Sequence, residues 1–261
     1  MPFSLDIQQI FIFVLILIRI MGILFALPFF GDSYVPLHVR LLFSVALTFF
    51  FTTHTHTAHV TAVESSKFLL IVVGVFKELL IGLAIGFLAK ITFEGVIMAA
   101  NLVSYQMGFG TANLLMPGSD TQLNAFTALH RMVTLFFFLS LSLHFMFIQA
   151  LADTFKYIPL QGLSIHGLFG SNIVSFSAHI FTIAIQLSAP ILVALLLTMT
   201  ALGLISKSVP QLNIFTISFP ASFFVGLSVY VLMSSFLPGW MKAHFTRSGH
   251  ELLASIHALA P

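Results

Sequence analysis

Long apolar runs separated by short polar segments dominate the sequence. Five runs are long enough to cross the roughly 30 Å hydrocarbon core of a membrane as helices. They cover residues 7–31, 68–93, 125–152, 173–205 and 212–240. A shorter run at 41–51 predicts a sixth helix if its flanks from Pro36 to Thr57 are included, and the amphipathic tail from Lys242 predicts another. The pattern therefore predicts an all-α fold.

The composition indicates that the solvent for these helices is lipid or other protein. Hydrophobic residues make up 59% of the 261 and charged residues only 7%, against about 25% charged in soluble domains. So few charges cannot cover a water-soluble surface. The start of the chain has no basic region and no small-residue cleavage site, so we expect its first run to be a retained membrane helix. We expect one membrane-embedded domain over residues 1–261.

Several function classes are disfavoured by what the sequence lacks. It has no cysteine for a thiolate metal site, and its net charge of +2 is too small to indicate a nucleic-acid partner. No nucleophile elbow, P-loop or metalloprotease motif is present. The spacing of His54, His56 and His59 matches no known ligand pattern, which favours incidental loop histidines. We therefore expect a non-enzymatic protein with no catalytic residue, metal or cofactor.

One stretch, residues 103–123, interrupts the apolar pattern with glycine, proline and methionine. Glycine permits conformations closed to other residues, proline ends a helix, and methionine offers soft apolar surface. Non-helical backbone at membrane depth is tolerated only inside protein or beside a water-filled cavity. The segment 106–122 is therefore either a flexible seal in a channel or a plain re-entrant or surface loop. Its candidate sealing residues are Met107, Gly108, Phe109, Gly110, Leu114, Leu115, Met116, Pro117 and Gly118.

Ionisable and small residues inside the apolar runs form a second candidate site. Arg19 lies in the middle of the first run, where a charge costs about 2.5–3.5 kcal/mol on insertion unless it faces a partner or water. In and just beyond the run 68–93, an ionisable residue or a glycine occurs at every fourth position. These residues therefore lie along one stripe of a helix. The stripe is either an internal packing seam or an interface with other subunits, since small residues four apart allow close helix approach. Its members are Glu78, Gly82, Gly86, Lys90 and Glu94.

A polar turn separates the last two apolar runs. Lys207 interrupts the hairpin, and Pro210 forces the preceding residue away from helical conformation. The turn is either a simple helix–helix connection or a cytoplasm-facing turn at a channel mouth. In the second case Gln211 and Asn213 would contact neighbouring subunits.

Several of these stretches, taken in order, resemble the FliR family of flagellar type III export-gate subunits, which has a homologous subunit in virulence secretion systems. The resemblance covers nearly the whole chain, and "PQLNIF" is its most specific part. The stretches are "RIMGILFALPFFGDSYVPLHVRL", "KELLIGLAIGF", "QMGFGTANLLMPGSDTQLNAFTALHRM", "LADTFKYIPL" and "APILVALLLTMTALGLISKSVPQLNIFTISFP".

The resemblance implies a fold, a location and partners. It implies kinked helical hairpins, like a FliP subunit fused to a FliQ subunit, in the bacterial inner membrane at the flagellar basal body. It implies a gate built with FliP and FliQ, with FlhB and FlhA nearby, through which unfolded flagellar proteins pass while membrane lipid surrounds it. It also implies that residues 106–122 project into the channel as a plug. The alternatives are a secondary transporter and a purely structural membrane scaffold.

Overall fold

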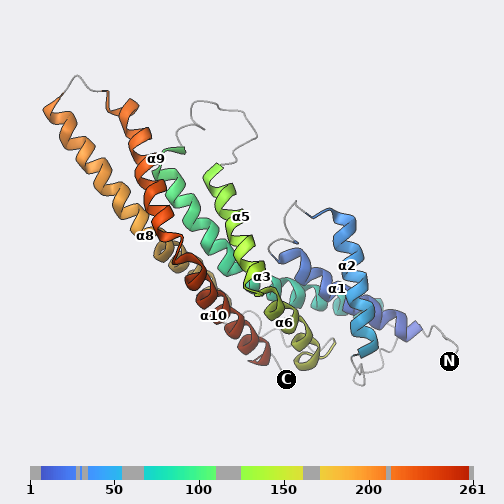
Figure 1. The fold of residues 1–261 in the computed structure, drawn as a ribbon. Helices are drawn as coiled ribbons and strands as arrows, with labels where there is room; N and C mark the ends of the chain where they lie inside the picture. Colours follow the sequence, from blue (N-terminus) through green and yellow to red (C-terminus); the bar gives the residue numbers. More distant parts are fainter. Residues whose placement is uncertain are drawn as a thin grey trace. The chain divides into compact units, whose positions relative to one another are not determined.

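Every regular element in the described part of the chain is an α-helix, which confirms the all-α prediction (Figure 1). This computed structural model describes residues 7–27, 30, 35–54, 68–109, 125–160, 171–209 and 213–258. The helices are α1 (Ile7–Ala26), α2 (Leu37–His54), α3 (Phe68–Gln106), α5 (Ala125–Ser140), α6 (His144–Tyr157), α8 (Ser171–Ser208), α9 (Ile214–Met233) and α10 (Leu237–Ala258).

Helix length and apolarity confirm an integral membrane protein. Among the described residues four helices can span a membrane, namely α1, α3, α8 and α9, and α5 with α6 makes a fifth if the pair is one broken span. In α9 only 11% of the spanning stretch Thr216–Met233 is buried by the rest of the chain. The apolar side chains of α9 therefore face mostly lipid or other protein.

The chain divides into two compact units. Unit 1 contains residues 1–91, 143–176 and 245–261, and unit 2 contains residues 92–142 and 177–244. Three helices, α3, α8 and α10, are each divided between the two units. The expectation that residues 1–261 act as one export-gate domain stays a prediction.

Two of the predicted apolar runs each contain a break, so neither forms one continuous helix. The run 125–152 is divided into α5 and α6 by a turn, in which Ser142 has a φ of 57°. This left-handed conformation stops the helical path although neither glycine nor proline marks the position. The run 212–240 is likewise broken at residues 234–236, between α9 and α10. Here Pro238 is a local signal, because proline is tolerated in the first turn of a helix, where its missing N–H has no intrahelical partner.

Two other elements extend beyond the apolar runs that predict them. Helix α3 continues past Glu94 to Gln106, because a charged side chain interrupts an apolar run without interrupting helical hydrogen bonding. The short run 41–51 forms an 18-residue helix, α2. In α2 the hydroxyls of Ser44 and Thr48 are buried and donate to the carbonyl oxygens four residues earlier, at 2.8 and 2.7 Å. These polar residues are thereby satisfied within their own helix.

In unit 1, α1 and the first part of α3 approach backbone to backbone. A Cβ atom added at Gly82 would lie 2.5 Å from the carbonyl oxygen of Arg19, and one at Gly86 would lie 2.7 Å from that of Ile23. Gly22 faces Gly82 from the opposite helix, with its added Cβ 3.0 Å from the Gly82 Cα. Only residues without a side chain allow this distance between the two helices. The surrounding core combines isoleucines of both helices with buried residues of α6 and α10.

In unit 2, the second part of α3 packs against both α5 and α8 (Figure 1). Thr127 of α5 donates to the side-chain oxygen of Asn101 of α3 at 2.9 Å. A Cβ at Gly95 of α3 would lie 2.8 Å from the side chain of Ile183 in α8. Helix α9 runs beside α8, and Gly226 of α9 faces Leu195 of α8. Unit 2 is thus built of helices packed side by side.

The α1–α3 approach predicts that Gly82→Ala destabilises the protein by about 1–3 kcal/mol, because the methyl group must push two helix backbones apart. The matched control is Gly203→Ala in α8, since an added Cβ there meets nothing within 4 Å. This control should be neutral or more stable by up to about 1 kcal/mol, because alanine is the better helix former. Thermal unfolding of the purified protein compares the two variants. Equal stability of both would contradict the close approach.

Candidate functional site

The end of α3 and the start of α5 form the two stems of the segment 106–122. Met107, directly after α3, is fully buried, and Phe126, the second residue of α5, is 7% exposed. Both belong to one buried apolar cluster with Ala100, Val103, Ile191 and Leu195. We call this cluster, together with the Tyr230 ring that packs against it, the stem cluster. The chain therefore leaves the stem cluster at residue 107 and returns to it at residue 126.

The exit from α3 depends on a glycine. The backbone N–H of Met107 still donates to Val103 at 2.9 Å, and that of Gly108 donates to Tyr105 at 3.1 Å. Gly108 then adopts a φ of +96°, which side-chain-bearing residues rarely adopt. This is the glycine that commonly ends a helix in left-handed conformation. The turn directs the following residue, Phe109, away from the helix axis.

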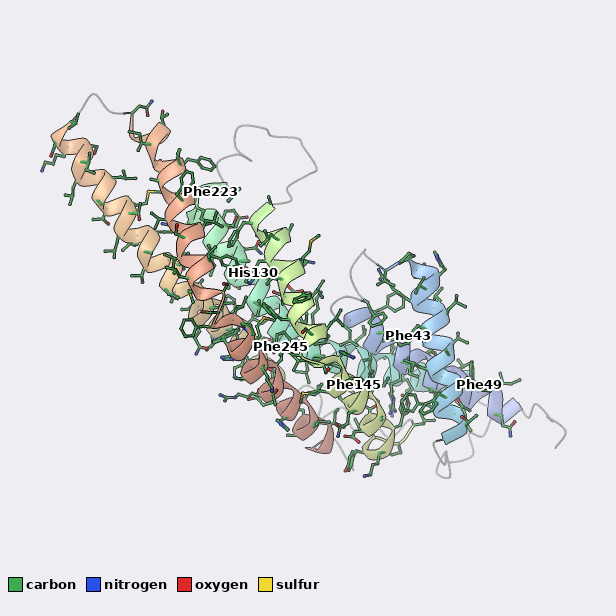
Figure 2. All side chains as sticks on the ribbon, in the orientation of Figure 1. Phe43, Phe49, His130, Phe145, Phe223 and Phe245 are labelled. Carbon is green, nitrogen blue, oxygen red and sulfur yellow. The ribbon has the colours of Figure 1, made fainter. Side chains whose placement is uncertain are left out.

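Phe109 is held by two aromatic rings of α9. Its ring lies 6.2 Å from that of Phe219 and 5.9 Å from that of Phe223, both edge to face, and Figure 2 marks Phe223 on α9. Such pairs add about 0.5–1.5 kcal/mol each beyond their buried area. A Cβ on Gly108 would also meet the Phe219 ring at 2.8 Å. The first three sealing candidates, Met107, Gly108 and Phe109, therefore pack against their own unit.

The other sealing candidates lie outside the described residues. These are Gly110, Leu114, Leu115, Met116, Pro117 and Gly118. The structure thus describes residues 106–109 of the segment and the helix α5 that follows it, and the role of the other residues stays a prediction.

Arg19 and Glu78 form a buried ion pair in unit 1. Both side chains have no exposed surface, and the Nε of Arg19 donates to Oε2 of Glu78. The guanidinium also donates to the carbonyl oxygens of Ile158 at 2.9 Å and Thr154 at 3.2 Å. It further lies 5.0 Å from the centre of the Phe155 ring. One side chain of α1 thus binds a carboxylate of α3 and the carbonyl end of α6, which carries partial negative charge.

The stripe of α3 continues into different surroundings. Gly82 and Gly86 face α1, as described above, whereas Lys90 is half-buried in unit 1 and Glu94 is half-buried in unit 2. The first three stripe residues and Arg19 therefore lie at the α1–α3 contact. A role of any stripe residue in contacts with other subunits stays a prediction.

The turn after α8 is described only at its edges. Lys207 lies in the last turn of α8 and is exposed, and Asn213 precedes α9 and is exposed. Pro210 and Gln211 lie outside the described residues, as do His56 and His59. No group of three metal-ligating side chains occurs within the described ranges.

One polar pair in unit 2 was not singled out from the sequence. His130 of α5 and Tyr230 of α9 lie with His130 Nδ1 2.9 Å from the Tyr230 hydroxyl. The His130 ring is parallel to the Phe126 ring at 6.3 Å, so the pair borders the stem cluster. The apolar run 125–152 contains two histidines, His130 and His144, and the run itself does not distinguish them. The partner of His130 lies 100 residues away.

Comparison with known proteins gives one consistent result. The sequence model of the family described as "Bacterial export proteins, family 1" matches residues 10–248. Three similar relatives all carry the name "Flagellar biosynthetic protein FliR". The protein of Aquifex aeolicus is 27% identical over 87% of this chain and 86% of its own length. The protein of Escherichia coli is 28% identical over 85% of this chain and 82% of its own length. The protein of Bacillus subtilis is 29% identical over 85% of this chain and 86% of its own length.

The buried pair predicts a large loss of stability when one charge is removed alone. Glu78→Gln should cost about 3–5 kcal/mol, because it leaves Arg19 charged and buried. The double variant Arg19→Met with Glu78→Leu should recover much of this loss. The matched control is Glu251→Gln, which breaks the exposed Arg247–Glu251 pair and should cost less than about 1 kcal/mol. Thermal unfolding of all variants checks the order. A Glu78→Gln variant as stable as the control would refute the pair's importance.

Proposed function

The chain belongs to the bacterial export proteins, family 1, and from this we propose that it is a non-enzymatic subunit of a flagellar protein export gate. The shared name of its relatives supports the flagellar assignment, since each is aligned over more than four-fifths of its length. The membrane helices support a place within the bilayer. We place the gate in the bacterial inner membrane, at the flagellar basal body, where it forms part of a channel for unfolded flagellar proteins.

The proposed partners are FliP and FliQ within the gate, with FlhB and FlhA nearby. The apolar surface that α8 and α9 leave uncovered supports contacts with other hydrophobic subunits. Leu196, Leu204, Phe224 and Leu232 are each at least 61% exposed in the single chain. A lone membrane protein could cover this surface with lipid, so co-purification is the deciding observation. In the gate, the turn from Lys207 to Asn213 would face the cytoplasmic side.

We assign the closing of the channel to the segment 106–122. The observation that carries this assignment is that both stems of the segment pack into the same buried cluster. Stems fixed in this way hold both ends of a segment that is rich in glycine and methionine, a composition that favours changes of conformation. An apolar constriction resists wetting and thereby resists ion flow.

The stems also suggest how such a plug opens. Met107 and Phe126 are buried, so moving them would expose apolar surface and separate packed helices. We propose that opening moves only the residues between Phe109 and α5, so that these buried stems stay in place. Opening by a translocating chain would then need no helix to unfold, and closure would follow when the chain has passed. The energy and the choice of substrate would come from other components.

The plug is tested by deleting residues 110–118, which retains Met107, Gly108 and Phe109. The assembled gate carrying this deletion should conduct ions in planar bilayers and in cells, because the proposed apolar seal is missing. The matched control deletes residues 55–63, which also removes nine residues, from the segment between α2 and α3. This control should leave permeability unchanged. Co-purification of the other gate subunits verifies that each complex is intact, and a tight gate without residues 110–118 would refute the plug.

A smaller change at the stem should have a weaker effect in the same direction. Gly108→Ala forces a side chain into left-handed conformation, at about 1–2 kcal/mol, and against the Phe219 ring. We expect a leak that is detectable but smaller than that of the deletion. Gly239→Ala serves as the control, since nothing lies within 4 Å of its added Cβ. Single-channel recording on the intact complex compares the two, and identical traces for both would argue against the stem's role.

A secondary transporter and an inert scaffold make different predictions. A transporter would act as a lone chain or simple oligomer, whereas a gate subunit purifies only with two other hydrophobic subunits in unequal copy number. Crosslinking from position 114 or 116 to a stalled export substrate separates the gate from a scaffold. A scaffold without a channel role gives no such crosslink.

A further inference from the structure

Unit 2 contains a cavity of about 80 Å³ beside the stem cluster. Its walls come from α3, α5, α8, α9 and the start of α10, and the lining is almost entirely apolar. Prominent wall residues are Ala100, Phe126, His130, Ile191, Tyr230 and Trp240. Among the described residues, no lysine, arginine, aspartate or glutamate contributes to the wall, so the cavity does not suit a charged ligand.

One buried nitrogen of a wall residue, His130, has no hydrogen-bond partner among the described residues. His130 is only 3% exposed, and its Nδ1 is engaged by the Tyr230 hydroxyl at 2.9 Å. Its Nε2 is buried and has no hydrogen-bond partner among the described residues. Buried polar atoms without a partner are rare and require an explanation. A bound molecule that reaches this nitrogen would supply one.

Three other polar side chains that line the cavity are Gln186, which is exposed, and two serines, which are already satisfied. Ser188 donates to the carbonyl oxygen of Ala184 at 2.7 Å, and Ser234 donates to that of Val231 at 2.7 Å. A buried water normally needs two to four polar partners. Among the buried, described side chains of the wall, His130 Nε2 is the one polar atom that lacks a partner, so ordered water alone is a poor occupant there. An apolar molecule with a single hydrogen-bonding group fits the wall better.

The tautomer of His130 does not change the chemistry required. If Nδ1 accepts from Tyr230, then Nε2 carries the proton and donates; if Nδ1 donates, then Nε2 accepts. A hydroxyl can satisfy either state because it both donates and accepts. A carbonyl or an amine without that versatility would serve one tautomer only.

We propose that this cavity binds a small neutral molecule with an apolar, ring-sized body and one hydroxyl group, which is hydrogen-bonded to His130 Nε2. The apolar body packs against Phe126, Ile191 and Trp240, and it reaches the site from the surrounding membrane. The inference does not depend on the proposed plug, since it rests on the cavity and on His130 alone.

Phenol and toluene form a matched pair of probes, because they differ only by a hydroxyl in place of a methyl group. Trp240 is the only tryptophan of the chain and lines the cavity, so it can report occupancy. The protein is labelled with 5-fluorotryptophan in the complex with which it purifies, in lipid nanodiscs. The Trp240 fluorine signal is assigned by its loss in Trp240→Phe.

Phenol should shift the Trp240 signal saturably and bind about three- to tenfold more tightly than toluene, which is the effect of one hydrogen bond. His130→Phe should remove this preference, so that phenol no longer binds more tightly than toluene. Ala100→Val should weaken both probes by filling the cavity. Equal affinity of the two probes for the unmodified protein would overturn the proposal, as would the absence of any saturable shift. This comparison needs no variant, so it decides the question even if His130→Phe fails to assemble.

Discussion

An arginine side chain inside a membrane protein has to find its counter-charge and its acceptors within the protein, and Arg19 determines much of unit 1 in doing so. Its guanidinium has no exposed surface and is bound by Glu78 and by the carbonyl oxygens of Thr154 and Ile158. This requires α1, α3 and the end of α6 to converge on one point. The glycines beside the pair allow that convergence, since side chains at Gly22 and Gly82 would hold α1 and α3 apart. The ion pair of Arg19 with Glu78 and the close packing of α1 against α3 therefore depend on each other.

The sequence predicts the helices well, because apolar length is a property of each segment by itself. It does not predict the break at Ser142, which neither glycine nor proline marks, and it marks the break before Leu237 only by Pro238. It also overlooks how far α3 continues, because Glu94 ends the apolar run without ending the helix. The prediction of helix type is thus stronger than the prediction of helix boundaries.

For the candidate site, the sequence identifies residues that are unusual for their position but does not identify their partners. Arg19, Gly82 and Gly108 stand out from the residue pattern, and each has a specific structural role. Their partners lie far along the chain, as His130 and Tyr230 do at a separation of 100 residues. No short-range pattern encodes such pairs. The resemblance to a known family adds what residue chemistry cannot, namely the kind of assembly to which these helices belong.

The order in which the chain is synthesised has a consequence for unit 1. Residues of α1, such as Ile12 and Ile16, share a buried core with Leu252 and Ile256 of the last helix. The segments of unit 2 lie between these two ends, at residues 92–142 and 177–244. A nascent chain emerging from the ribosome can therefore complete unit 2 while unit 1 still lacks its final helix. Until α10 has been synthesised, lipid, the insertion machinery or a neighbouring protein must cover the apolar residues of α1 that pack against it.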